Sequence, residues 1–511
     1  MASVDGTCSA GEANAERGAD WLILLPSGSP RTAVCFGTTR LAEALRRAGV
    51  RVLGEAEAKA VDLAVSSDAR HATLRTAAGK LRPGGALYLE TRRLFPLGRR
   101  RLTHRLRRVG LLDGTVYWRA QSDGVTTAWV PVAETGPVRH FLARRTGRST
   151  GTRAVARRLA SWAFDALRRA DMLLPLAAVA QRPQDDARDA EEGVLPLLAD
   201  RWNDLAGDPA PSRLSWLVLA PGTRSISKIV AFVFAGGASD PALVVKGGRT
   251  VAANAALERE ALSLRSLEAR TSGQPARAPK CLLVLRRLDQ RVLLVETVVR
   301  GTPLYETLSP QTFRRVSLDA VDWLVNLARD GSRPAGDDSR TVHTLLTDVP
   351  AALANPLAPT LDRLAASAEL IPVAFEQRDF SPWNLLLDGE QGLGVVDWES
   401  AEPEGFPLLD LVYFLANCGF LLDRAGSVDA CVRSYRRTFD GRAWTGAVAR
   451  ECIHTYAERI GLSEPLVPPL RALTWLVHLH TAARRSASSG QFGGLPSGSD
   501  LFAALLRDEL T

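Results

Sequence analysis

The stretch Phe375 to Glu399, FEQRDFSPWNLLLDGEQGLGVVDWE, decides the fold of the C-terminal half of the chain. It contains two short apolar runs, Leu385 to Leu387 and Leu393 to Val396, separated by an Asp-Gly pair and a Gln-Gly pair. This pattern is typical of a β-hairpin whose turn uses residues with positive φ. We therefore predict a hairpin that brings the residue before its first strand and the residue after its second strand to one edge.

Three acid or amide side chains mark that edge. Asn384 precedes the first strand, Asp397 follows the second, and Asp379 lies on the loop that enters the hairpin. Oxygen ligands suit Mg²⁺, which proteins usually hold through one or two side chains plus substrate phosphates. A carboxylate beside such a phosphate can accept the proton of an attacking hydroxyl. We predict Asn384 and Asp397 as metal ligands and Asp379 as the catalytic base, in preference to a plain surface turn.

The spacing of Arg378-Asp379, Asn384 and Asp397-Trp398-Glu399 resembles the catalytic loop and metal aspartate of the protein-kinase-like fold. Its details are most similar to the aminoglycoside phosphotransferase and choline kinase group. The resemblance covers about Ser212 to the C-terminus. It implies an α+β two-lobed domain that uses ATP and Mg²⁺ to transfer the γ-phosphate to a hydroxyl of a small molecule, such as an aminoglycoside, sugar or amino alcohol.

Two positions leave alternatives open. Gln377 stands where family members have a histidine, which in the family packs and hydrogen-bonds around the metal aspartate. The alternative prediction is therefore a pseudokinase-type module that binds nucleotide without turnover. Asp410 opens a predicted helix, and it could cap that helix or, by the resemblance, brace the catalytic loop.

The segment before this stretch predicts the strands of a small kinase lobe. The strands are expected at Leu214 to Ala220, Ile226 to Ala235 and Ala242 to Lys246. The turn between the first two ends at Ser225 and would offer backbone N–H groups and a hydroxyl to nucleotide phosphates.

By the resemblance, Lys246 contacts the α and β phosphates of ATP and pairs with Glu260 of a predicted helix from Ala252 to Leu267, where Glu258 is the competing acid. A further hairpin ends at Glu296 and Val298. By the resemblance, these two residues correspond to the hinge between the two lobes, where backbone groups hold the edge of the adenine ring of ATP.

The N-terminal region alternates predicted strands with helices, which argues for a parallel βαβ sheet. Strands are expected at Ala33 to Phe36, Val50 to Leu53, Val61 to Val65 and Ala86 to Glu90, a helix at Thr39 to Ala48 and a turn at Leu81 to Gly85. The motifs VDLAVSSD and LRPGGALYLE resemble class I S-adenosylmethionine-dependent methyltransferases. The cofactor loop retains only Gly37, and Glu55 is a poor acidic partner, so we predict a degenerate α/β Rossmann-like domain for structure or recognition rather than a methyltransferase.

These patterns predict five segments. They are a disordered tail (1-18), a degenerate Rossmann-like domain (19-150), a helical connector and linker (151-208), a kinase-like N-lobe (209-301) and a kinase-like C-lobe (302-511). The connector includes an amphipathic helix at Ala154 to Ala170, and a helix is expected at Leu195 to Leu205. In the C-lobe, helices are expected at Pro310 to Arg329, Pro356 to Leu370, Leu409 to Leu422, Val428 to Phe439, Thr445 to Ile460 and Leu466 to Ser486. Trp475, His478 and His480 are candidates to line the acceptor pocket.

Composition favours a globular cytoplasmic protein. The 511 residues carry a formal net charge of +8, and the basic run Arg92 to Arg108 could bind nucleic acid. Few aromatic residues accompany that run, so we interpret it as a solvated face and do not expect a nucleic-acid partner. The six cysteines show no metal or disulfide spacing. No signal peptide or membrane span is expected, and the oligomeric state stays open.

Overall fold

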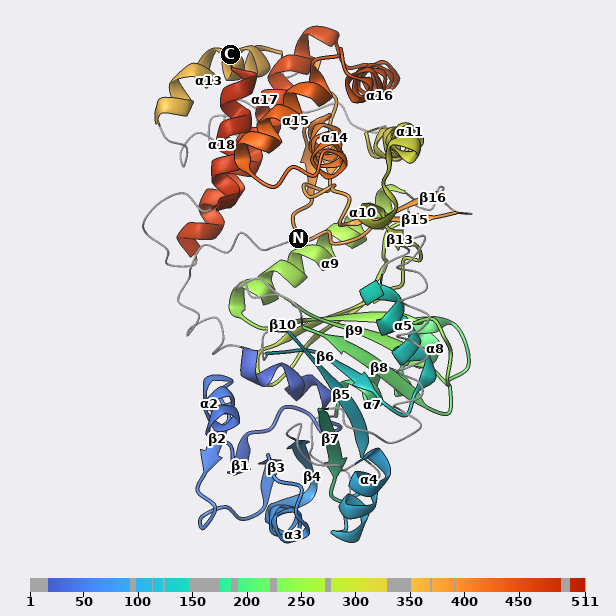
Figure 1. Cartoon of the computed structure of the whole chain (residues 1–511), viewed down its shortest axis with the longest axis vertical. Helices are drawn as coiled ribbons and strands as arrows, with labels where there is room; N and C mark the ends of the chain where they lie inside the picture. Colours follow the sequence, from blue (N-terminus) through green and yellow to red (C-terminus); the bar gives the residue numbers. More distant parts are fainter. Residues whose placement is uncertain are drawn as a thin grey trace. The chain divides into compact units, whose positions relative to one another are not determined.

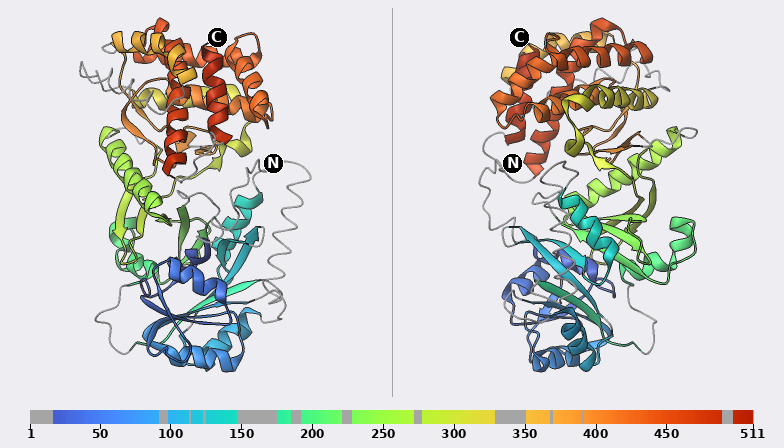
Figure 2. Two further views of the ribbon diagram at one scale, coloured as in Figure 1. Left: turned by 90° about the vertical axis from the view of Figure 1, so that its left-hand side faces the viewer. Right: turned by 45° about the vertical axis from the view of Figure 1, so that its right-hand side comes forward.

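The computed structural model describes residues 17–91, 98–112, 114–122, 125–146, 175–184, 192–220, 228–271, 277–328, 351–367, 370–389, 392–488 and 497–510. The chain divides into two compact units (Figures 1 and 2). One comprises Met1–Glu258 and Cys281–Val298, and the other comprises Arg259–Lys280 and Val299–Thr511. The predicted tail 1–18 lies outside the described residues except for Arg17 and Gly18, and the predicted helix Ala154 to Ala170 lies wholly outside them.

The described residues of the first unit form one mixed sheet of 12 strands, in the order β11-β12-β10-β9-β8-β6-β5-β7-β4-β3-β1-β2. The strands are β1 (Thr32–Phe36), β2 (Arg51–Leu53), β3 (Val61–Ser66), β4 (Leu81–Glu90), β5 (Thr115–Ser122), β6 (Val125–Pro131), β7 (Leu176–Gln181), β8 (Leu214–Leu219), β9 (Lys228–Ala235), β10 (Leu243–Gly248), β11 (Cys281–Arg286) and β12 (Val292–Thr297). The predicted N-terminal strands and the predicted small-lobe strands thus belong to the same sheet, joined by the pairing of β6 with β8.

The parallel pairing that the sequence predicts is confirmed for β1 with β2, β1 with β3, and β3 with β4. The turn expected at Leu81 to Gly85 is wrong, because β4 already begins at Leu81. The register between β3 and β4 shifts from Val61↔Leu81 to Leu63↔Ala86. The Pro-Gly-Gly triplet is therefore accommodated as an irregularity within the paired strand.

Helices cover both faces of this sheet. They are η1 (Arg17–Leu24), α2 (Thr39–Arg47), α3 (His71–Lys80), α4 (Arg99–Arg108), α5 (Thr135–Thr146), α7 (Val194–Asp200), α8 (Trp202–Ala206) and α9 (Val251–Arg270), which continues into the second unit. On one face, a single core cluster extends from Ala33 of β1 to Val295 of β12 and includes Trp21 and Leu25 of the N-terminal segment. The opposite face has two clusters, one beneath α3 and α4 and one beneath α5.

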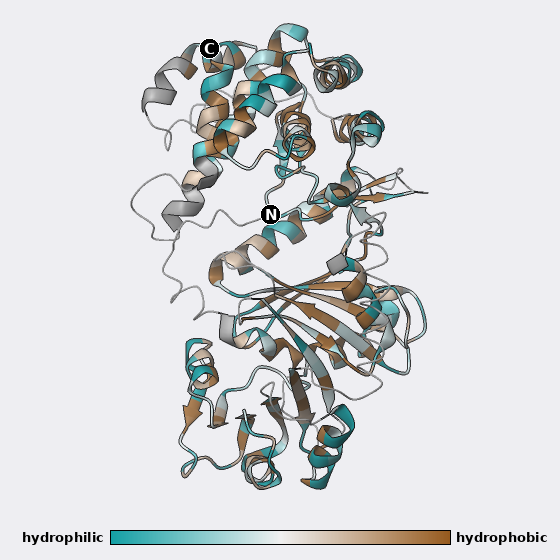
Figure 3. Ribbon diagram, viewed as in Figure 1, coloured by the Kyte–Doolittle hydropathy of each residue, from teal (hydrophilic) through white to brown (hydrophobic). Residues whose placement is uncertain are grey.

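One helix prediction in this unit needs adjustment. The helix expected at Leu195 to Leu205 is two short helices, because Arg201 leaves helical geometry at φ −98° and ψ 10°. The basic run forms α4, which buries Leu102 and Leu106 and exposes a strongly hydrophilic side (Figure 3). Arg92 and the residues up to 97 lie outside the described chain. No helix formed by the described residues is both long and apolar enough to cross a bilayer.

The second unit is mainly helical. Its helices are α10 (Leu304–Thr307), α11 (Pro310–Leu327), α13 (Ala351–Ala366), α14 (Leu409–Leu422), α15 (Val428–Phe439), α16 (Trp444–Ile460), η3 (Glu464–Leu466), α17 (Val467–Ser488) and α18 (Ser497–Glu509). Its short strands are β13 (Thr302–Pro303), β14 (Ala374–Glu376), β15 (Leu385–Asp388), β16 (Gly392–Val395) and β17 (Glu402–Gly405). The helix expected from Pro356 begins instead at Ala351, since the alanines upstream favour helix formation. The sequence analysis missed α18.

We expect Trp21→Ala to destabilise the first unit by about 3–5 kcal/mol, because Trp21 is buried and stacks on Tyr88 at a centroid distance of 3.8 Å. Leu112→Ala, at a site 52% exposed in the same unit, is the control and should change stability by less than about 0.5 kcal/mol. Urea unfolding measures both. Equal effects would show that the N-terminal segment is not part of the shared core.

Candidate functional site

The predicted hairpin is confirmed. Strands β15 and β16 pair antiparallel in the register Leu385↔Val395 to Asp388↔Gly392, and Val396 N donates to Asn384 O at 2.9 Å. Asn384 therefore lies beside the residue that precedes Asp397. Arg277 supports the far end of the hairpin, since its guanidinium lies 3.6 Å from the Asp388 carboxylate.

Asn384 and Asp379 are hydrogen-bonded to each other. Asn384 Nδ2 donates to Asp379 Oδ2 at 2.8 Å and to Asp379 O at 3.0 Å. Both side chains are partly exposed. Because the amide nitrogen of Asn384 donates to Asp379, the Oδ1 atom of Asn384 is the one that could bind a cation.

Asp397 and Arg378 both adopt the left-handed backbone region, with φ values of 64° and 63°. Such a conformation is uncommon and costly for residues other than glycine, and it persists only where the surroundings fix it. Strain of this kind clusters at functional sites. Arg378 directly precedes the candidate base, and Asp397 is itself a candidate metal ligand, so the hydrogen bonds that hold these two residues are part of the site.

Gln377 links the backbone around the two strained positions from a fully buried location. Its Nε2 donates to Asp397 O at 2.6 Å and to Val396 O at 3.1 Å, and its Oε1 accepts from Asp379 N at 2.8 Å. One amide thus ties the backbone of the candidate base to the backbone of the candidate metal ligand. Gln377 was predicted only as the loss of a histidine, whereas an amide can donate and accept at once.

Asp410 braces the loop and does not cap its helix. The N-cap position of α14 is Leu408, whereas the Asp410 carboxylate accepts from Gln377 N at 2.6 Å and from Arg378 N at 2.9 Å. Burial, followed by the charge of Glu376, raises the pKa of Asp410 to about 7, although the two N–H donors oppose the rise. The cap alternative is therefore wrong.

Glu376 is a functional neighbour that sequence reasoning missed. It is 1% exposed and its carboxylate lies 2.5 Å from Arg378 Nε, which fixes the side chain of that residue. A Cβ at Gly405 would lie 2.3 Å from Glu376 Cδ, so only glycine leaves space for this carboxylate. The Glu-x-Arg spacing before Asp379 was the available signal.

Glu260 lies in the part of α9 that belongs to the second unit and is completely buried. Its Oε1 accepts a hydrogen bond from Trp398 N at 3.1 Å, directly after Asp397. The carboxylate thus holds the backbone on the other side of the strained residue. The predicted pairing of Glu260 with Lys246 stays a prediction.

Lys246 lies in the first unit near the end of β10 and is 7% exposed. Its Nζ pairs with Glu296 Oε1 of β12 at 2.9 Å. The backbone roles predicted for Glu296 and Val298 stay predictions. Ser225 and the turn that contains it lie outside the described residues.

Two of the three candidates for the acceptor pocket belong to the core. Trp475 is 0% exposed and donates from Nε1 to Tyr435 Oη at 3.0 Å, and His480 is 8% exposed. Their burial favours a place in the core of the helical unit, and the predicted pocket contact stays a prediction. His478 is partly exposed and stacks on Tyr413 at a centroid distance of 3.9 Å, so its predicted role stays open.

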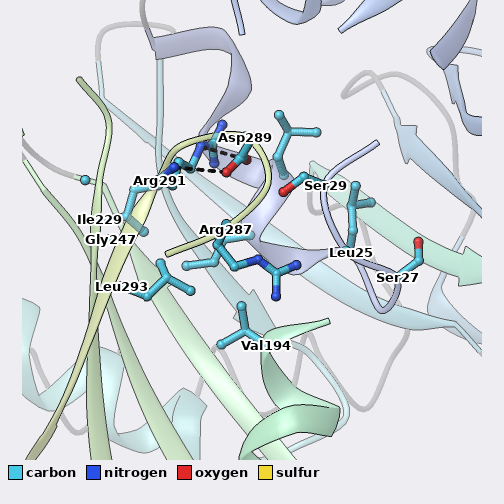
Figure 4. Close-up of a pocket in the computed structure, with 14 residues that line it drawn as sticks. Leu25, Ser27, Ser29, Val194, Ile229, Gly247, Arg287, Asp289, Arg291 and Leu293 are labelled. Carbon is cyan, nitrogen blue, oxygen red and sulfur yellow. Dashed lines mark hydrogen bonds and ion pairs between the residues drawn. The ribbon is translucent and has the colours of Figure 1, made fainter. Parts of the chain in front are cut away.

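A pocket in the first unit lies elsewhere and includes none of the predicted site residues (Figure 4). Leu25, Ser27 and Ser29 of the N-terminal segment form one side, and the turn from Arg287 to Arg291 forms another. Two arginines that line the pocket have partners. Arg291 lies 3.3 Å from the Asp289 carboxylate, and Arg287 donates a hydrogen bond to Glu192 O. We interpret it as the seam where the N-terminal segment packs on the sheet.

The donor set at the hairpin edge is a carboxylate and an amide oxygen. Within the described parts of the chain, no group of three His, Cys, Asp or Glu side chains could hold a metal by itself. A cage made only of protein ligands is therefore not present there. Two oxygen donors are what Mg²⁺ uses when substrate phosphates complete its shell.

Comparison with known proteins gives three results. No protein-family model matches the chain, and no curated protein matches it. Solved structures do match, as follows. A Ralstonia eutropha JMP134 protein assigned as an aminoglycoside phosphotransferase is 15% identical, with a TM-score of 0.43 over 61% of this chain and 96% of that chain. The GDP complex of aminoglycoside 2'-phosphotransferase-IIIa is 13% identical, with a TM-score of 0.37 over 62% and 98%. A thermostable mutant of aminoglycoside phosphotransferase APH(4)-Ia is 15% identical, with a TM-score of 0.36 over 62% and 99%. Such low identities and TM-scores do not establish a family for this chain.

We expect Gln377→Leu to lower the free energy of unfolding by about 1–3 kcal/mol for each buried backbone group that it leaves unpaired. Gln377→His should recover part of the loss, because the imidazole restores a ring N–H donor. Chemical denaturation of both variants measures the effect. A Leu variant as stable as the parent would contradict the proposed brace.

The raised pKa of Asp410 predicts a pH dependence of stability. The ordinary carboxyl pKa is 3.8 and the folded value is about 7, so between them the folded chain binds more protons than the unfolded chain. The contribution of Asp410 is therefore fully present below pH 3.8 and is lost as the pH rises through 7. Denaturation from roughly pH 5 to 8 should show this fall, and Asp410→Asn should flatten it. An unchanged slope in the variant would contradict the assignment.

Proposed function

We propose that the chain is an ATP- and Mg²⁺-dependent phosphotransferase that acts on a hydroxyl group of a small molecule. The proposal is supported chiefly by one arrangement, in which Gln377 and Asn384 link Asp379 to the segment that carries Asp397. Lys246 would contact the nucleotide phosphates. Bound Mg²⁺, held by Asn384 and Asp397, would neutralise phosphate charge.

Asp379 would act as the base in the transfer step. The acceptor oxygen attacks the γ-phosphorus as the bond to the β,γ-bridging oxygen breaks, ADP leaves, and the hydroxyl proton passes to the Asp379 carboxylate. Asn384 would keep that carboxylate oriented through its 2.8 Å hydrogen bond. Positioning and charge neutralisation contribute most of the rate in this chemistry.

The arrangement around Gln377 favours turnover over the nucleotide-binding alternative. That alternative was motivated by the missing histidine, but Gln377 makes hydrogen bonds to both Asp379 and Asp397. The acceptor stays a class: sugars, amino alcohols and aminoglycosides are the compounds to test. A cytoplasmic location belongs to the same proposal.

We expect the purified chain to consume ATP in the presence of Mg²⁺ and one acceptor from that panel. Asp379→Asn should reduce the transfer rate by about 10²–10⁴-fold while ATP affinity stays within a few-fold, because the base acts on the acceptor. Asp429→Asn, at an exposed site on α15 of the same unit, is the control and should leave the rate unchanged. Measurements are coupled ADP release and calorimetric titration.

If ATP and Mg²⁺ give neither heat of binding nor a thermal shift, the proposed function is wrong. If ATP binds but no acceptor in the panel is phosphorylated and Asp379→Asn changes nothing, the nucleotide-binding alternative is the better description.

A further inference from the structure

The pair between Lys246 and Glu296 follows from the strand register. In the antiparallel pairing of β10 with β12, Lys246 lies opposite Leu294, and Val244 lies opposite Glu296. Residues opposite each other share a face, and so do residues two apart on one strand. Lys246 and Glu296 are therefore diagonal neighbours on one face of the sheet, and their side chains meet at 2.9 Å.

The surroundings of this pair are apolar. The same face carries the core cluster beneath α5, which includes Phe232 and Val244, with Val230 and Val298 packed against it. The Lys246 and Glu296 side chains are only 9% and 4% exposed. An ammonium in such a setting without a partner would favour its neutral form, whereas a carboxylate in contact keeps it charged.

Stability does not account for the pair. Desolvation of two charges usually cancels their attraction, and apolar residues of similar volume are often as stable or more stable at such positions. Lys246 lies on β10, an interior strand of the sheet, with β9 on one side and β12 on the other. A charged lysine held at this place therefore has a use other than folding, and the proposed function supplies one.

We propose that Glu296 is a positioning residue for Lys246: its side-chain carboxylate keeps the lysine protonated and directed for contact with nucleotide phosphates. This inference rests on the proposed function, and it gives Glu296 a side-chain role beyond the backbone role predicted from the sequence. Loss of the Glu296 carboxylate should therefore weaken the binding of ATP and not the binding of adenosine, which has no phosphates.

The pH response of two other side chains near this face has to be considered. The face is covered by α5, which contributes His140 and Arg144, with ring and guanidinium contacts to Phe232 at 4.9 and 4.8 Å. Burial and the charge of Arg144 lower the pKa of His140 to about 4, with Asp240 opposing the shift. His140 is therefore neutral and Arg144 charged throughout the neutral range, so neither of them produces a pH effect there.

The test is calorimetric titration of the full chain with Mg²⁺–ATP and, separately, with adenosine. We expect Glu296→Gln to weaken ATP binding about tenfold at neutral pH while adenosine affinity stays within twofold. The loss should grow as the pH rises from roughly 6.5 to 9, because removal of the carboxylate lowers the pKa of the buried ammonium. Parent protein should show little change over this interval. Glu134→Gln, which removes the carboxylate 3.3 Å from Arg213, is the matched control and should behave like the parent.

The Lys246→Met variant distinguishes the phosphate role of Lys246 from the positioning role of Glu296. If Lys246→Met weakens ATP binding and Glu296→Gln does not, the positioning role is wrong and the phosphate role of the lysine stands. If neither variant affects ATP binding, both are wrong. If Glu296→Gln tightens ATP binding, the carboxylate competes with phosphate, and the positioning role is overturned. In the double variant, loss of Glu296 should add less than twofold to the effect of Lys246→Met.

Discussion

The candidate site depends on two residues that are held in the left-handed backbone region without being glycine. Arg378 and Asp397 would relax to ordinary conformations if their neighbours allowed it. Buried acceptors and donors prevent this: Asp410 holds the backbone before and at Arg378, Gln377 holds the carbonyl of Asp397, and Glu260 holds the N–H that follows it. The strained backbone and the buried groups that restrain it depend on each other, because buried hydrogen-bonding atoms need partners.

The first unit is organised by a different constraint, which is the continuity of its sheet. Strand β6 pairs with β8, so the edge of the N-terminal strands is closed by the strands that carry Lys246. One core cluster follows the whole face from Ala33 to Val295. An exposed edge strand invites wrong pairing, and this arrangement removes two such edges at once. The Rossmann-like assignment of the N-terminal region stays a prediction, whereas its parallel pairing is established.

Local pattern was enough for some features and not for others. The hairpin around Asn384 could be predicted because its turn residues and apolar runs are adjacent in the sequence. The joining of β6 to β8 could not, because residues far apart in the chain pair there and periodicity carries no information about partners. The contrast between Trp475 and His478 has the same cause: both fit a helix face, and only packing decides which one is buried. Asp410 illustrates a third case. An aspartate at the start of a helix can cap that helix or bind the backbone of a neighbouring loop, and the sequence is the same in both cases.

Gln377 and Glu296 lead to one physical conclusion from two separate units. Each is a buried polar side chain, and such a group is costly to bury unless it is hydrogen-bonded or paired. Each interacts with residues to which the sequence predicts a role in phosphate chemistry. Gln377 is hydrogen-bonded to Asp379 and Asp397, and Glu296 forms an ion pair with Lys246. Removing one member of a buried polar or charged pair is costly, whether or not the pair itself adds stability. Both groups therefore restrain residues that the proposed function would use.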